Sequence, residues 1–234
     1  MITLLGAPTP NTRKIGIALN EMKLEWRLQI IDMLAGEQLT PEFLKLNPNN
    51  KTPVIIDDDG PCDNFVLWDS GAILLYLAEK SGLFLPKDPV KRALCWQWLM
   101  FQMSGVGPMF GQAAHFAFYA AERHEYPTQR FNRETARLMR VLDGRLAEAE
   151  WLAGDEYTIA DMATMPWLQQ LLADQGEQYP NAARWNAAML DREEVREGLK
   201  TGTARPETIE GGGLTGLSEE QQSILWGDRQ HQTN

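Results

Sequence analysis

The sequence predicts a chain of two parts, an α/β part followed by an all-helical part. Three observations lead to this expectation. Strand-like apolar runs occur only within the first 82 residues. Helical apolar spacing continues beyond Pro89, with no strand signal after residue 85. A short stretch that contains Pro86 and Pro89 lies between the two parts and is typical of a linker.

Residues 2–32 predict a βαβ unit. Residues 2–5 are apolar and are followed by Gly6, as expected of a buried strand that ends in a turn. Thr9 and Pro10 then start a helix, because threonine is a good N-cap and proline is favoured at the first helical position. Residues 26–30 alternate apolar and polar side chains, which predicts a second strand.

Residues 40–82 predict a short helix, a hairpin and a further helix. Thr40 and Pro41 repeat the start signal of the first helix. Residues 54–56 and 65–68 are strand-like runs, and the turn-rich residues between them favour a hairpin. Asp69 and Ser70 start a helix for which Gly82 is a plausible end. The first part therefore consists of βαβ, a short helix and ββα.

The later sequence predicts helices throughout. A helical pattern runs over residues 90–104, and a motif at Thr158 to Asp161 has the form of an N-terminal cap. Further helices are marked by apolar residues at helical spacing: Phe131, Leu138, Leu142, Leu146, Trp185 and Met189.

The expected division of the chain is 1–83, 90–200 and a C-terminal extension over 201–234. In the extension, glycines 211–213 indicate a flexible break. Ser218 and Gln221 resemble a capping box before a short docked helix that contains Trp226. The chain is expected to be loose from about Gly227.

Composition excludes several classes of function. The 234 residues include 22 basic and 32 acidic side chains, and the net charge of −10 argues against nucleic acid or an anionic membrane as partner. No apolar stretch approaches the ~20 residues of a membrane span. Cys62 and Cys95 form neither a CxxC motif nor a metal cluster. With no basic leader at the start, we expect a cytoplasmic protein without a metal.

Five motifs resemble those of the glutathione transferase superfamily, and their combination is similar to its bacterial Nu class, which includes relatives of the yeast nitrogen-regulator prion protein. They lie at residues 7–11, 41–54, 69–73, 107–112 and 157–161. The resemblance implies an N-terminal thioredoxin-like βαβαββα domain and a C-terminal helical bundle domain, the glutathione transferase fold. It also implies glutathione as co-substrate.

The resemblance assigns the catalytic role to Thr9 and Asn11, whose side chains would face the glutathione sulfur. No tyrosine lies within the first 75 residues, and no cysteine or serine lies near this turn. From spacing alone, Thr9 only caps the helix and Asn11 is a solvated residue of its first turn. Asparagine cannot act as a general base, so Asn11 would orient the sulfur and stabilise its charge.

The resemblance also implies a set of glutathione ligands. A cis bond at Thr52–Pro53 would present Thr52 to the cysteinyl backbone. Ser70 would hold the γ-glutamyl carboxylate at a helix N-terminus, with Asp69 near the ammonium group. The further ligands are Gln38 and Lys51 at the glycyl end and Arg130, which would reach the glutathione of a neighbouring subunit. Solvated surface roles remain open for Gln38, Lys51 and Arg130, and an ordinary helix start for Asp69 and Ser70.

An aromatic-rich stretch is the candidate second-substrate side. It contains Phe110, His115, Phe116, Phe118 and Tyr119, which suit apolar groups. The alternative is that these side chains only pack the core between the two parts.

The resemblance implies a homodimeric disulfide-bond reductase with modest transferase or peroxidase activity. Its partners would be glutathione or glutathione disulfide and a small-molecule disulfide or electrophile. The alternatives are a conjugating transferase for apolar electrophiles and a non-catalytic glutathione sensor or scaffold. A thioredoxin-type redox protein is disfavoured because the CxxC motif is missing.

Overall fold

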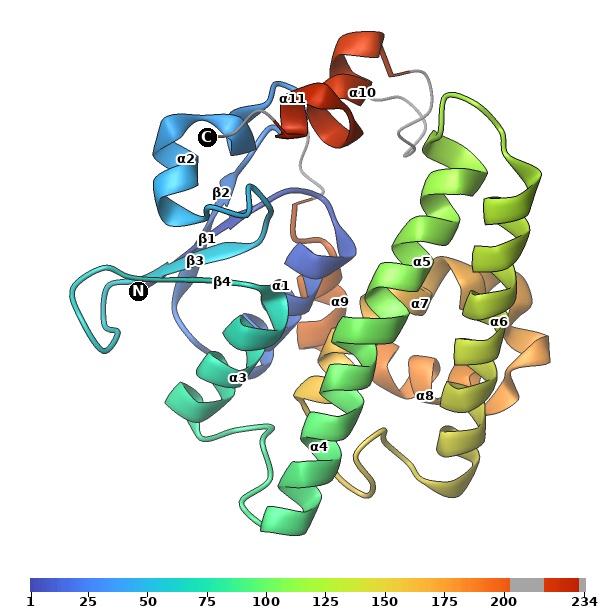
Figure 1. Cartoon of the computed structure of the whole chain (residues 1–234). Coiled ribbons are helices and arrows are strands. Elements are labelled where there is room, and N and C mark those ends of the chain that lie inside the picture. Colours follow the sequence, from blue (N-terminus) through green and yellow to red (C-terminus); the bar gives the residue numbers. More distant parts are fainter. Residues whose placement is uncertain (203–216, 232–234) are drawn as a thin grey trace.

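The computed structural model describes residues 1–202 and 217–231 (Figure 1). The first part contains β1 (Ile2–Gly6), α1 (Pro10–Glu21), β2 (Trp26–Ile30) and η1 (Glu37–Leu39). It continues with α2 (Pro41–Leu46), β3 (Val54–Asp57), β4 (Phe65–Trp68) and α3 (Ser70–Ser81). The strand order is β2-β1-β3-β4, with β1 and β2 parallel and the other neighbours antiparallel. This arrangement confirms the predicted βαβαββα domain.

The two faces of the sheet are covered by different helices because neighbouring strand residues point to opposite sides. Leu4 and Ile55 belong to the large core shared with α1, α3 and the helical part. Leu5 and Val54 point the other way, into a small cluster with Phe43 of α2. The period-two pattern thus places α2 alone on one face and leaves α1 on the face toward the helical part.

The second part is helical, as predicted. One continuous helical course runs through α4 (Pro89–Phe101), the π-helical turn η2 (Gln102–Val106), α5 (Gly107–Ala114) and a second π-helical turn η3 (His115–Tyr119). It is followed by α6 (Glu125–Glu148), α7 (Ile159–Gln175), η4 (Gly176–Gln178), α8 (Pro180–Leu190) and α9 (Glu193–Leu199). The course extends 15 residues beyond the predicted end at residue 104, since the π turns carry it past Pro108.

Helix α1 is the element that joins the two parts. It packs against α7 and α9 as well as α3. A Cβ atom on Gly198 would lie 2.5 Å from the backbone nitrogen of Ile17, so only glycine permits this approach of α9 to α1. Arg192 also donates two hydrogen bonds to the buried carboxylate of Glu21, at 2.5 and 2.7 Å. The orientation of the parts is therefore fixed by direct packing and one ion pair.

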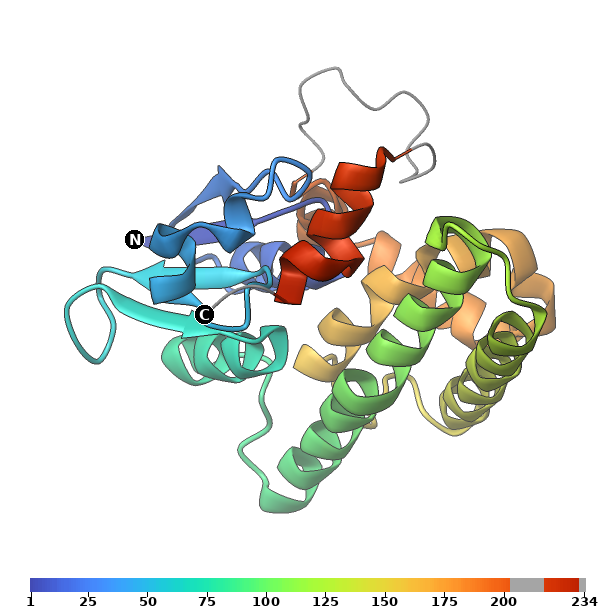
Figure 2. The same cartoon turned by 45° about the horizontal axis from the view of Figure 1, so that its top comes forward.

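The C-terminal segment, α10 (Glu219–Trp226) and α11 (Asp228–His231), lies between the sheet part and α5 (Figures 1 and 2). The predicted capping box is present, with Ser218 and Gln221 bonded to each other's backbone N–H groups. The expectation of a loose end from about Gly227 is wrong for residues 228–231, because a further helical turn follows Gly227. The predicted break at glycines 211–213 lies outside the described residues.

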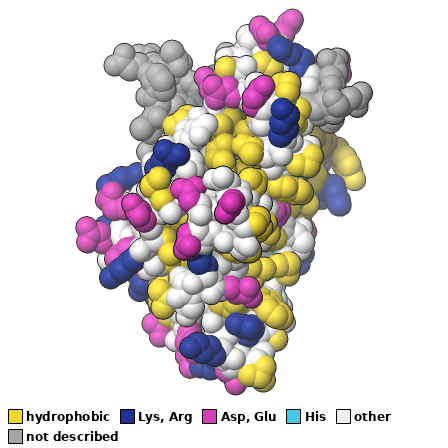
Figure 3. Space-filling view, turned by 90° about the vertical axis from the view of Figure 1, so that its left-hand side faces the viewer, with side chains coloured by type: hydrophobic (Ala, Val, Ile, Leu, Met, Phe, Trp, Pro, Cys, Tyr) yellow, Lys and Arg dark blue, Asp and Glu magenta, His cyan; other side chains and the backbone are white. Residues whose placement is uncertain are grey.

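Within the described residues, no helix is long and apolar enough to cross a membrane. Figure 3 views the molecule from the side of α2 and the hairpin. Acidic and basic side chains are interspersed among the described residues of this face, and hydrophobic side chains gather in its upper half. This face therefore lacks the clustered positive charge that phosphate-rich partners require.

Helix α7 begins at a buried cap. Thr158 and Asp161 form the predicted capping box. The fully buried Asp161 carboxylate accepts hydrogen bonds from Leu152 N, Thr158 N, Thr158 Oγ1 and Trp185 Nε1, at 2.9 to 3.1 Å. Burial raises the pKa of Asp161, and these donors oppose that shift. The carboxylate thereby fixes the loop before α7, the start of α7 and a core tryptophan of α8.

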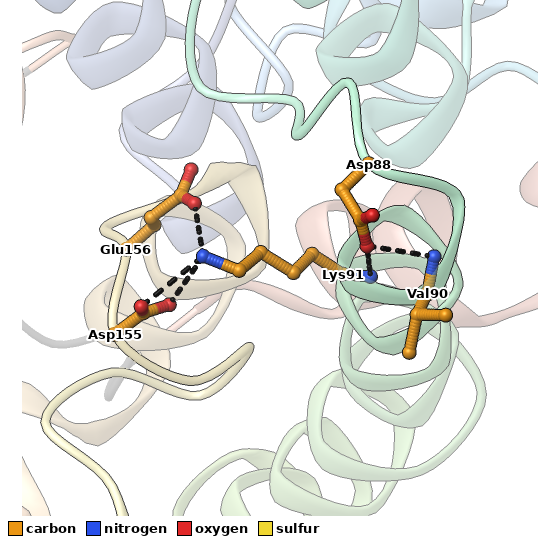
Figure 4. A network of polar contacts seen from close by, with 5 residues as sticks. All are labelled: Asp88, Val90, Lys91, Asp155 and Glu156. Atoms are coloured by element: carbon orange, nitrogen blue, oxygen red, sulfur yellow. Dashed lines mark hydrogen bonds and ion pairs between the residues drawn. The ribbon is translucent and has the colours of Figure 1, made fainter.

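Asp155, in the loop before α7, is exposed and contrasts with the buried Asp161. At the start of α4, Asp88 caps the N–H groups of Val90 and Lys91 (Figure 4). The Lys91 ammonium bonds to Asp155 and Glu156 across from it, at 2.7 to 3.1 Å. Such solvent-exposed pairs contribute little to stability.

We expect Asp161→Ala to lower the free energy of unfolding by about 3 kcal/mol or more, because it leaves several buried donors without an acceptor. Urea denaturation followed by circular dichroism measures the change. Asp155→Ala is the matched control and should leave the midpoint nearly unchanged. Equal effects of the two substitutions would show that the buried cap is not a main support of the fold.

Candidate functional site

The register of the sheet brings the predicted ligands to one edge. Leu5 pairs with Val54, and Val54 pairs with Trp68. One residue further on, Gly6, Pro53 and Asp69 therefore lie side by side at the end of the sheet. The loop of Thr9 follows Gly6, and the loop toward Gln38 follows β2, which ends beside Gly6. Segments far apart in the chain thus meet where β1, β2 and β4 end.

Thr9 takes the capping role that spacing alone indicates. Its Oγ1 accepts a hydrogen bond from Thr12 N at 3.3 Å and lies 3.2 Å from Thr12 Oγ1. A hydroxyl that accepts at the cap still has its own hydrogen to donate. The contact of Thr9 with a thiolate therefore stays a prediction.

Asn11 is oriented by a residue of the second part. Trp167 of α7 donates its Nε1–H to Asn11 Oδ1 at 3.1 Å. Because an indole can only donate, the oxygen of the Asn11 amide must face Trp167, and the NH₂ group points away from it. Asn11 is therefore arranged as a donor at the amino end of α1, where the helix dipole also favours negative charge.

The neighbouring loops hold the predicted glycyl-end ligands. The Thr52–Pro53 bond is cis, as the resemblance implies. Gln38 is 3% exposed and donates to Met33 O at 3.3 Å, while its Oε1 is buried with no partner among the described residues. Lys51 is exposed. The unpaired Gln38 oxygen is an acceptor that a ligand donor can satisfy.

Asp69 and Ser70 form the amino end of α3. Asp69 has a φ of 74°, a strained conformation of the kind that concentrates at functional sites. Its Oδ1 accepts from Gly71 N and Ala72 N at 3.0 and 3.2 Å, so two N–H groups of the helix end are already occupied. Ser70 is buried, and its hydroxyl lies against Lys14 and Met103. The Ser70 N–H is not among the groups that Asp69 caps.

The aromatic candidates make contacts in two directions, and His115 packs edge-on against Phe116 at 5.1 Å. Phe116 stacks on Phe131 of α6 at 5.5 Å, which is packing within the helical part. His115 and Tyr119 instead contact Trp226 of α10, at ring distances of 5.1 and 5.5 Å. Burial lowers the pKa of His115.

The other predicted residues of the helical part differ widely in exposure. Phe110 is buried, while Phe118 is 67% exposed. Arg130 lies exposed on α6, and its reach to a neighbouring subunit stays a prediction.

The C-terminal segment connects this aromatic cluster with the loops that carry Gln38 and Lys51. Ile224 packs against Gly36, and Asn50 Nδ2 donates to Gln230 O at 3.4 Å. Gly36 and Asn50 are close in sequence to Gln38 and Lys51, respectively. The segment therefore spans from the sheet part to η3 (Figure 2).

Sequence reasoning missed three residues of this region, Trp167, Gln102 and Lys14, and it placed Trp226 in a docked helix without its partners. Trp167 and Gln102 come from distant segments, and no local pattern connects them with α1. Lys14 carried a usable signal, since it lies on the same helical stripe as Asn11, Ile15 and Ala18 and is a cation among apolar positions. No group of three acidic, histidine or cysteine side chains suited to a metal occurs in the described residues.

Comparison with known proteins gives the family. The model of the glutathione S-transferase N-terminal domain matches residues 9–80, and that of the C-terminal domain matches residues 103–193. The chain belongs to the glutathione S-transferase family. This finding confirms the predicted superfamily and fold.

Individual transferases of this family are similar over most of their length. The disulfide-bond oxidoreductase YfcG of Escherichia coli K12 is 43% identical over 204 residues, which cover 85% of this chain and 94% of YfcG. A Burkholderia graminis glutathione transferase with two glutathione molecules bound per subunit has a TM-score of 0.82 at 42% identity, covering 87% of this chain and 89% of that one. A Pseudomonas putida glutathione transferase with one glutathione disulfide bound per subunit has a TM-score of 0.81 at 42% identity. The match covers 85% of this chain and 90% of that one.

We expect Trp226→Ala to loosen the C-terminal segment, because it removes both aromatic contacts with η3. Each such pair contributes about 0.5–1.5 kcal/mol beyond its buried area. Amide hydrogen exchange of residues 219–226 should accelerate about ten-fold or more. Tyr126→Ala, which removes an exposed ring of α6, is the control. Unchanged exchange in Trp226→Ala would mean that the segment is held by other contacts.

Proposed function

We propose that this glutathione transferase reduces disulfide bonds with glutathione as the electron donor. The observation that supports this best is the amide of Asn11, held as a donor by Trp167 at the amino end of α1. The similar YfcG is named a disulfide-bond oxidoreductase, and the two similar crystal structures hold two glutathione molecules and one glutathione disulfide per subunit. The chain has no CxxC motif, so the reacting sulfur belongs to glutathione.

The thiol of glutathione must ionise to react. A free cysteine thiol has a pKa of about 8.5, and the thiolate is the nucleophile. A two-unit reduction of this pKa corresponds to about 2.7 kcal/mol. A helix N-terminus contributes about 0.3–1 kcal/mol and up to ~2. A hydrogen bond to a charged group contributes about 1.5–3 kcal/mol, so a donor such as Asn11 is needed beside the α1 dipole.

The reaction then proceeds by two thiol–disulfide exchanges. The thiolate of a first glutathione attacks one sulfur of the disulfide RSSR, forms the mixed disulfide and releases one RS⁻. The thiolate of a second glutathione attacks the glutathione sulfur of the mixed disulfide, which forms glutathione disulfide and releases the other RS⁻. Both leaving thiolates take protons from solvent. Two glutathione molecules thereby lose two electrons, and RSSR gains them.

The remaining predicted ligands would hold the rest of the tripeptide. Ser70 would bind the γ-glutamyl carboxylate, with Asp69 beside the ammonium group. Thr52 would pair with the cysteinyl backbone, and Gln38 and Lys51 would reach the glycyl end. These residues lie in loops or at a helix start beside one edge of the sheet.

A second activity, conjugation of apolar electrophiles, is favoured by the aromatic cluster of His115, Tyr119 and Trp226. These rings pack on one another and offer apolar contact area for such a substrate. Turnover of a chloronitrobenzene compared with that of a small disulfide measures which activity dominates. Modest peroxide reduction would use the same thiolate.

We expect Asn11→Ala to lower kcat/KM for a small disulfide such as hydroxyethyl disulfide by roughly 10–100-fold, because it removes a hydrogen bond to a charged sulfur. The assay follows glutathione disulfide formation through a coupled reductase. Asn132→Ala, an exposed asparagine of α6, is the matched control.

A second variant, Trp167→Phe, keeps an aromatic ring but removes the indole N–H that orients Asn11. It should cause a smaller loss in the same direction. Unchanged activity of Asn11→Ala would remove this residue from the mechanism. Glutathione binding without any turnover by the wild-type chain would instead identify a sensor or scaffold.

We also propose a cytoplasmic homodimer. Trp96 and Met100 lie four residues apart on α4 and are 43% and 46% exposed. Met100 lines an open pocket of about 400 Å³ with Ala72 and Leu75 of α3 and with Asp69. This apolar face lies beside Asp69, a proposed glutathione ligand. An exposed apolar face of this kind can be buried against a second copy of the chain.

We expect sedimentation velocity to give twice the mass of one chain. Met100→Glu should shift the protein toward the monomer, because it places a charge in the apolar face. Val90→Glu, at an exposed position of the same helix, is the control. A wild-type monomer at micromolar concentration would contradict the dimer.

A further inference from the structure

Lys14 of α1 is a buried cation at the junction of the two parts. Its side chain is 1% exposed, and its ammonium group is enclosed by residues of three other elements. The Nζ atom donates to Gln102 Oε1 at 2.8 Å, to Ser70 Oγ at 3.3 Å and to Met103 Sδ at 3.6 Å. It also lies 5.9 Å from the centre of the Trp167 ring.

These contacts fix the direction of two neighbouring polar groups. Because an ammonium group can only donate, the Gln102 amide must turn its oxygen toward Lys14. Its Nε2 is then buried with no partner among the described residues. Gln102 begins the π turn η2, a geometry that occurs frequently at functional sites. Gln102 thus turns its Oε1 toward Lys14 and leaves its own Nε2 without a hydrogen-bond partner among the described residues.

The hydroxyl of Ser70 is oriented in the same way. Its oxygen accepts from Lys14, so its hydrogen is left to donate elsewhere. The acceptor in the structure is Met103 Sδ at 3.8 Å, a weak partner. A carboxylate at the amino end of α3 is a far stronger acceptor.

The ammonium of Lys14 has no ion pair among the described residues. Burial lowers the pKa of Lys14 to about 7, and the negative charge of Asp69 opposes that shift. The side chains that contact Nζ from α3, the α4–η2 course and α7 are Ser70, Gln102, Met103 and Trp167, all uncharged. A buried cation without a bonded anion is costly, and an apolar residue of similar volume is often no less stable.

We propose that Lys14 is a positioning residue for the γ-glutamyl carboxylate of glutathione, and that its ammonium aims the Ser70 hydroxyl and supplies the positive charge that this carboxylate meets. The inference rests on the proposed function. It adds a proton to the binding step, because an approaching carboxylate favours the charged form of Lys14. Affinity is then greatest where Lys14 is already protonated and falls as the pH rises through 7.

Isothermal titration with S-methylglutathione tests this inference, because the probe carries the carboxylate but has no thiol to ionise. For the wild-type chain, we expect Kd to rise about ten-fold from pH 6 to pH 8. Titrations at pH 8 in two buffers of different ionisation enthalpy should show uptake of nearly one proton.

Lys14→Met should bind at least ten-fold more weakly at pH 6, with a Kd that is flat up to pH 8. In turnover it should raise KM for glutathione and leave kcat within about two-fold, because Asn11 holds the sulfur separately. Its urea midpoint should not fall greatly, since an unpaired buried charge is removed. Lys87→Met, at an exposed lysine of the connecting loop, should behave as the wild type.

Binding of Lys14→Met within two-fold of the wild type at pH 6 would overturn the inference and leave the proposed function intact. A flat wild-type Kd without proton uptake would overturn it too, and this measurement decides the matter if Lys14→Met does not fold. A wild-type chain that binds neither S-methylglutathione nor glutathione would overturn the proposed function as well.

Discussion

The burial of α1 between the sheet and the helical part is the constraint on which the rest of this structure depends. Close approach of α9 at Gly198 and the ion pair of Glu21 with Arg192 hold the helix from the second part. Ile15 and Leu19, both fully buried, belong to the same apolar core as Leu4 and Ile55 of the sheet. With its body fixed on all sides, the helix presents its amino end rigidly at the edge where β1 ends.

The same burial explains why polar residues of α1 acquire definite directions. On an exposed helix, Asn11 and Lys14 would sample many rotamers in water. Here Trp167 reaches both of them, by a hydrogen bond to the amide and by its ring toward the ammonium. A residue of the helical part thereby sets the direction of two polar groups at the amino end of a helix in the first part. The proposed site consequently depends on both parts.

The local elements of the fold were largely predictable because they depend on short-range patterns. The Thr–Pro starts at residues 9 and 40, the cap at Thr158 and the capping box at Ser218 all occur where the sequence indicates. The π turns were not predictable, because their extra residue is accommodated by contacts of Gln102 and His115 with other segments. The helical turn after Gly227 was missed because a glycine usually ends a helix.

The candidate site was predictable only in part, and for a similar reason. Motifs locate Thr9, Pro53 and Ser70, since each lies at a turn or helix start with its own local signal. The residues that orient the site come from distant segments. Trp167, for example, lies 156 positions from Asn11, to which it donates a hydrogen bond. For Phe116, composition alone cannot distinguish a ring that packs on Phe131 from one that also faces a substrate, so its assignment stays a prediction.

The two π turns give the α4–α5 course a property that a regular helix lacks. Each holds one residue more than an α-helical turn, so the helix face that follows it is rotated by about 100° relative to an uninterrupted helix. Loss of one residue from 102–106 would remove this offset and turn the face that carries Phe110 and His115 by about 100°. It would thereby carry His115 away from Trp226 of α10. Length variation at these positions would therefore change how the α4–α5 course meets the C-terminal segment.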